Sequence, residues 1–129
     1  MAKARCIVNT AMKATAAALL FAMFLQPVFA GQYFSGDPGA IALHGSLGEI
    51  AAWLALTQAA LALCRVAMRD MRWPAAAAFL GLFALTGLQV HLGHASSFAL
   101  HVPLGACLLA VSLLTTVWLF RALPAVAKG

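Results

Sequence analysis

Acidic residues are scarce in this sequence. Only three of its 129 residues are Asp or Glu, against eight Lys and Arg, while 64% are hydrophobic. A soluble domain of this length needs more charge than that to cover its surface. The chain is therefore predicted to be an integral membrane protein, and its length allows one bundle, a single transmembrane domain over residues 1–129.

Cysteine is also scarce, which excludes two kinds of site. The three cysteines are an odd set and give no disulfide framework. No Cys-x-x-Cys-His occurs, so a covalently attached c-type haem is excluded. The sequence also has no visible nucleophile–base pair and no open metal site, so we expect no catalysis by this chain alone.

Four apolar runs are each long enough to cross a bilayer as a helix. They cover residues 12–30, 41–64, 74–92 and 98–120. The short segments between them are rich in turn residues or, at 65–74, basic and ended by Pro74, which suits the first turn of a helix. The expected fold is all-α, an antiparallel up-down four-helix bundle in the membrane.

Lysine and arginine are missing from the first and third connecting segments, and this sets the expected orientation. All eight lie before or at the very start of the first run, between the second and third, or after the fourth. The positive-inside rule then predicts that both termini lie in the cytoplasm. The membrane is expected to be the inner membrane of a bacterium. The basic residues, Arg65 among them, are interpreted as interfacial anchors, and no nucleic acid is expected as a partner. An alternative interpretation takes the first run as a signal peptide cleaved before Gly31.

An internal repeat is the most informative pattern. "ALHGSLG" at 42–48 and "ALHVPLG" at 99–105 are identical at five of seven positions. "LFAMFLQPVFAG" (20–31) and "LFALTGLQVHLG" (82–93) share Leu-Phe-Ala, Leu-Gln and Gly. The first two helices therefore resemble the last two, as a parallel repeat about an axis along the membrane normal. The repeat also argues that the first run is kept, because it is the partner of the third.

The repeat predicts a site built on two histidines. His44 and His101 begin the second and fourth spans, at equal depth on the outer side, and a pseudo-two-fold axis points them at each other. Two imidazoles on facing helices can bind the two faces of a metal macrocycle. Gly48 and Gly105 follow by four residues and share the histidine face. We interpret them as a vacant wall for the macrocycle; close helix approach is the alternative.

Two glutamines and one acid are the other notable polar residues of the spans. Gln26 and Gln89 are candidate cofactor contacts, with pairing between helices as the alternative. Glu49 is the only acid inside a span, and a polar residue there suggests a function. It lies about 140° around the helix from His44, so the two side chains are not expected to share a face.

Further candidates gather at the outer end of the third span. His91 and His94 are three residues apart, a spacing that can present two nitrogens to zinc or copper, with His101 as a third imidazole. Alternatively, His91 and His94 lie beside haem propionates, where Tyr33 is a further candidate contact.

The segment "GLQVHLGHASSFALHVPLGACLLAVSLL" (87–114) resembles the second hairpin of one half of a haem A synthase. The resemblance extends over residues 20–121 and is shared, more loosely, with membrane b-type cytochromes. It implies a four-helix bundle whose two haem ligands match His44 and His101. The synthases carry a Glu before the first of these histidines and an Arg after it, whereas here Leu43 precedes His44 and Gly45 follows it. The resemblance therefore implies that haem b is held, without the synthase reaction.

The predicted function is thus a small membrane haem b protein with two histidine ligands. It would carry electrons between a quinol or a redox partner subunit and an acceptor on the outer side, alone or as a homodimer in the lipid bilayer. Two alternatives are kept. One is a cofactor-free membrane scaffold in which the repeat serves helix packing, and the other is a small transporter that uses Glu49.

Overall fold

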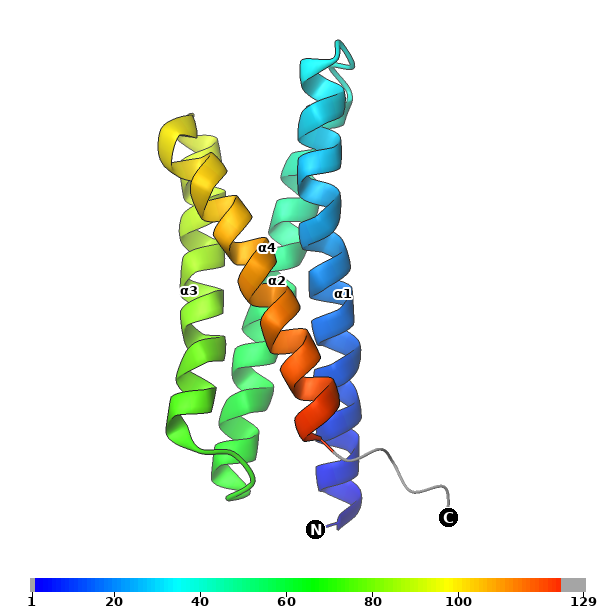
Figure 1. Ribbon diagram of the computed structural model, residues 1–129, viewed down its shortest axis with the longest axis vertical. Coiled ribbons are helices and arrows are strands. Elements are labelled where there is room, and N and C mark those ends of the chain that lie inside the picture. Colours follow the sequence, from blue (N-terminus) through cyan, green and yellow to red (C-terminus); the bar gives the residue numbers. More distant parts are fainter. Residues whose placement is uncertain (1, 124–129) are drawn as a thin grey trace.

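The computed structural model describes residues 2–123, which form four helices (Figure 1). They are α1 (Ala2–Phe34), α2 (Ala40–Ala67), α3 (Trp73–His94) and α4 (Phe98–Ala122). All four are long and apolar enough to cross a membrane, so the chain is a multi-pass membrane protein with an all-α fold. The basic residue Lys128 and the C-terminal segment 124–129 lie outside the described residues.

The helices contain the predicted spans, and each extends beyond its span. The largest extension is in α1, whose 33 residues correspond to about 50 Å of helix, against about 30 Å for the hydrocarbon core of a bilayer. The additions contain several Ala and Arg residues, which favour helix, and their charged and polar residues lower the mean hydropathy. Hydropathy therefore located the membrane crossings and missed the helical extensions.

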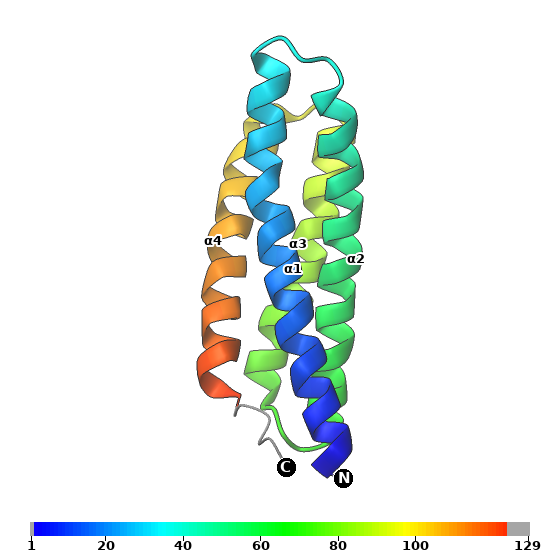
Figure 2. The ribbon, with the colours of Figure 1, turned by 90° about the vertical axis from the view of Figure 1, so that its right-hand side faces the viewer.

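The four helices pack as a ring in which each contacts its two neighbours. The neighbouring pairs are α1–α2, α2–α3, α3–α4 and α4–α1, while α2 and α4 lie on one diagonal and α1 and α3 on the other. Successive helices are antiparallel (Figure 2). One end of the bundle carries the start of α1, the α2–α3 turn and the end of α4, and we call it the basic end. The opposite end, with the α1–α2 and α3–α4 turns, is the outer end.

Three helices end in the same way, which sets where the next helix begins. At each end the N–H of the residue after the turn donates to a carbonyl five residues back, as Asp37 does to Gln32 (3.1 Å), Asp70 to Arg65 (2.8 Å) and Ser97 to Leu92 (3.0 Å). The residue before each donor has positive φ: Gly36, Arg69 and Ser96. This is a Schellman ending, and it usually places glycine at that position.

The buried core fills the basic end and the middle of the bundle. The largest fully buried apolar side chains are those of Phe79, Met12, Leu19, Leu108 and Leu119. Buried alanines on α2 at 51, 55, 59 and 62 let its neighbours approach closely. The outer end is formed by residues 24–50 and 87–107. Among these described residues, only Ala40 is buried. The outer third of the bundle is therefore loosely packed.

Arg65 corrects one expectation. It was predicted to be an interfacial anchor in the connecting segment, but it lies on α2 and is only 7% exposed. Because α2 continues to Ala67, Arg65 falls one turn after Ala62 on the buried face. Its guanidinium donates from Nη1 to Asn9 Oδ1 and from Nη2 to the Asp70 carbonyl (3.0 Å). It is a buried, bonded group that joins α1, α2 and the α2–α3 turn.

Candidate functional site

The first half of the site is a reciprocal pair of hydrogen bonds between α1 and α2. The Nε2 of Gln26 donates to the backbone carbonyl of His44 over 3.2 Å. In return, Nδ1 of His44 is 3.1 Å from the backbone carbonyl oxygen of Gln26. Each residue therefore uses its side chain on the other's backbone, which fixes the two helices in register.

The second half repeats this arrangement between α3 and α4. The Nε2 of Gln89 donates to the carbonyl of His101 over 2.9 Å, and Nδ1 of His101 is 3.0 Å from the carbonyl oxygen of Gln89. The two residues are 18 positions apart in the first pair and 12 in the second. We call these two arrangements the Gln–His clips. The glutamines thus serve the pairing of helices, the alternative that the sequence left open.

The clips fix the tautomer of both histidines. A carbonyl oxygen only accepts, so each Nδ1 must carry the proton that it shares with the glutamine carbonyl. Each Nε2 is then left as the nitrogen with a lone pair. This is the state in which histidine binds metals, with its other nitrogen oriented by a backbone carbonyl.

The two imidazoles meet across the centre of the bundle. The ring centroids of His44 and His101 are 5.9 Å apart and the ring planes are inclined by 61°. Their helices lie on a diagonal, and within residues 2–123 no Cα atom of α2 comes within 8 Å of one of α4. The histidines are half-buried, above the last buried layer of the core. The repeat therefore predicted their juxtaposition correctly.

The separation of the imidazoles suits two ligands on one metal centre. Two metal–nitrogen bonds of about 2.0 Å, each extended by about 1.2 Å to the ring centre, put the centroids about 6.4 Å apart. The observed 5.9 Å is close to that value. Gln89 Oε1 is also buried with no hydrogen-bond donor in the described chain. That acceptor can take a bond from water or from a bound group. The donor set therefore fits a haem iron.

The role predicted for the two glycines needs correction. A Cβ at Gly105 would lie 2.8 Å from Nε2 of Gln89, and one at Gly48 would lie 3.6 Å from Nε2 of Gln26. The space beside each glycine thus holds the amide of a clip and is not vacant. Gly105 allows the Gln89 amide to reach the histidine backbone, whereas at Gly48 a side-chain Cβ would make only an ordinary contact with the Gln26 amide.

Gly93 is a site residue that the sequence reasoning missed. A Cβ there would lie 3.0 Å from Cε1 of His101, so the imidazole rests directly against the α3 backbone. The position could have been found from its spacing, since Gly93 follows Gln89 by four residues, one helical turn. The corresponding position after Gln26 is Ala30, so the two halves of the site are not identical.

The remaining candidates do not join the histidine pair. His91 and His94 are exposed on α3, and Tyr33 is 42% exposed, with its ring 5.6 Å from that of Phe34. Within residues 2–123 no three His, Cys, Asp or Glu side chains gather as metal ligands. The predicted grouping of His91, His94 and His101 is therefore not formed.

Comparison with known proteins gives this chain no family. No family model matches it, and neither a curated protein nor a solved structure does. The site is therefore interpreted from its own contacts, and the resemblance of residues 87–114 to half of a haem A synthase stays a prediction.

Proposed function

We propose that this protein binds one haem b between His44 and His101 and carries electrons across or along a bacterial inner membrane. The observation that carries the proposal is the pair of Gln–His clips. They hold two imidazoles 5.9 Å apart, each with Nδ1 bonded to a carbonyl and Nε2 left to bind a metal.

The residues of this chain would divide the work as follows. His44 and His101 would supply the two nitrogens that hold the haem, and the carbonyls of Gln26 and Gln89 orient the two rings. The core below them, which includes Leu108, keeps water out from the basic end. Haem b, if bound, would supply a one-electron carrier, with His44 and His101 as its ligands. A quinol or a redox partner subunit is the expected donor.

One observation favours a second candidate, a cofactor-free scaffold. The clips already satisfy the backbone and amide groups that they join, and the glutamine amides fill the space beside Gly48 and Gly105. In membranes, interhelical hydrogen bonds and close packing are what hold helices together. On this alternative the histidines act only as parts of the clips. Glu49, the coupling group of the transport alternative, is exposed on α2 and gives that alternative no interior acid.

The test is the visible spectrum of the full chain, purified after expression with ample haem. We expect one haem per chain and the sharp reduced bands of low-spin iron after dithionite. His44→Ala and His101→Ala should each abolish the low-spin spectrum, because each removes one axial nitrogen.

His91→Ala and His94→Ala are the matched controls, since both histidines are exposed and lie at the same end of the bundle. They should leave the spectrum unchanged. A wild-type protein without a Soret band, with a stability that falls on His44→Ala, would support the scaffold and reject the haem proposal.

A further inference from the structure

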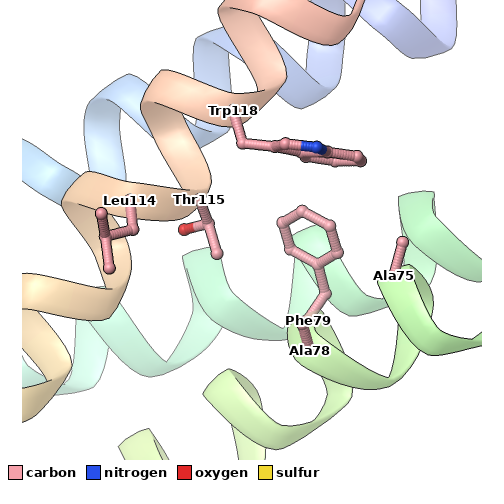
Figure 3. A pocket seen from close by; sticks show the side chains of 6 residues that line it. All are labelled: Ala75, Ala78, Phe79, Leu114, Thr115 and Trp118. Carbon is pink, nitrogen blue, oxygen red and sulfur yellow. The ribbon is translucent and has the colours of Figure 1, made fainter.

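The basic end carries a second feature, an apolar groove between α3 and α4. It has a volume of about 320 Å³ and is lined by Ala75, Ala78, Phe79, Leu114, Thr115 and Trp118 (Figure 3). Phe79 and Trp118 face each other across it, with ring centroids 6.3 Å apart. Its polar lining groups are the Trp118 indole N–H and the Thr115 hydroxyl, which donates to the Val111 carbonyl of its own helix (2.8 Å). The rest of the lining is alanine, leucine and phenylalanine, so the groove suits a largely apolar occupant.

A charged pocket continues this groove at the α2–α3 turn. It has a volume of about 230 Å³ and shares Ala75 and Trp118 with the apolar groove. Its other lining residues include Arg65, Arg72 and Asp70. The two hollows thus form one path, with charge at the basic end and apolar side chains toward the middle of the bundle.

The charged pocket has an excess of positive charge. The Asp70 carboxylate is already paired, since its Oδ2 lies 3.1 Å from Nε of Arg5. Arg65 donates to two neutral oxygens, and its buried Nε has no acceptor in the described part of the chain. Arg72 is exposed, and its guanidinium forms neither a hydrogen bond nor an ion pair within residues 2–123. The pocket therefore holds two guanidinium groups and one carboxylate, and that carboxylate is paired with Arg5, which does not line the pocket.

We infer that this path binds one anionic phospholipid from the leaflet at the basic end. Its phosphate would meet Arg65 and Arg72, and an acyl chain would lie along Ala75, Ala78 and Leu114. Basic pockets between membrane helices on the cytoplasmic side suit such headgroups, and Trp73, 63% exposed, lies where aromatic residues mark the interface. A lipid explains both hollows, whereas free phosphate would fill only the charged one. The inference is independent of the haem proposal.

The test is native mass spectrometry of the full chain in detergent, titrated with phosphatidylglycerol, phosphatidylcholine or inorganic phosphate. We expect one phosphatidylglycerol to bind per chain, more tightly than phosphatidylcholine, with no competition from inorganic phosphate. Arg72→Gln should weaken phosphatidylglycerol binding about fivefold. Ala78→Leu should weaken it by about the same factor, because the larger side chain fills the groove.

Each variant has a matched control. Arg121→Gln removes an exposed charge at the same end, and Ala84→Leu enlarges an exposed alanine of α3; neither residue lines the two hollows. Both should bind the lipid as the wild type does, with helix content checked by circular dichroism for all four. Equal binding of the two lipids, an equal loss in Arg121→Gln and Arg72→Gln, or displacement by inorganic phosphate would overturn the inference.

Discussion

The two ends of this bundle are held together by different means. Toward the basic end, large side chains such as Phe79 and Leu119 are fully buried. The outer third has almost no buried side chain, and its helices are joined in pairs by the Gln–His clips. Between helices in lipid, apolar burial gives little hydrophobic gain, so packing and hydrogen bonds are the available forces. The comparison teaches that the basic end combines packing with hydrogen bonds such as that of Arg65 to Asn9, while the outer end depends mainly on the hydrogen bonds of the clips.

The largest effect is expected from a cavity in the packed region. Leu108→Ala should lower the free energy of unfolding by about 2 kcal/mol, the low end of the usual range because the unfolded helices remain in an apolar solvent. The free energy of unfolding is measured by denaturation with SDS in mixed micelles, monitored by circular dichroism. Leu92→Ala, in the half-buried outer third, should cost less than about 1 kcal/mol. Equal losses would mean that the two regions are packed alike.

A smaller effect should separate the two clips. A methyl group at residue 105 must displace the Gln89 amide, so Gly105→Ala should cost about 1 kcal/mol through a weakened bond to the His101 carbonyl. The contact at residue 48 is an ordinary one, and Gly48→Ala should leave stability unchanged or raise it by up to about 1 kcal/mol through helix propensity. The same SDS titration compares them. A similar change in both variants would contradict the difference in fit.

The smallest effect concerns two hydroxyl groups one turn apart on α4. Ser112 Oγ is buried and has no partner among the described residues, so Ser112→Ala should leave the free energy of unfolding within about 0.5 kcal/mol of the wild type or raise it. Thr116 donates to the Ala16 carbonyl over 3.3 Å, so Thr116→Val should lower that free energy by about 0.6 kcal/mol. Unfolding curves of both variants in SDS measure the two changes in free energy. The prediction fails if Ser112→Ala is the more destabilising.

The sequence predicted the crossings and the histidine pair because both depend on strong patterns. Apolar runs report the hydrocarbon core directly, and a polar residue repeated at one depth in two apolar hairpins indicates equivalent positions that face each other in the bundle. The function of the glycines was harder to predict. A missing side chain indicates space, but the pattern could not show that the Gln89 amide of another helix occupies the space at Gly105.

The polar contacts of the basic end were not predicted at all. Gln58 is 1% exposed and donates to the Met12 carbonyl (2.7 Å) and to Thr15 Oγ1 (2.6 Å), yet it has no counterpart in the repeat. Arg65 was placed in a loop because charge ended the apolar run before the helix itself ended. Such contacts join residues far apart in the chain, and only the packing of the helices brings them together.

The clips close over 18 residues in one hairpin and 12 in the other, with the same atoms bonded in both. The bonded atoms all belong to the helices, so the turn between them is not part of the Gln–His clip. A hairpin of this kind can gain or lose residues at its tip while its two helices keep their alignment. Gln on one helix facing His-x-x-x-Gly on the next is, in that sense, a transferable unit for setting the alignment of antiparallel helices in a membrane.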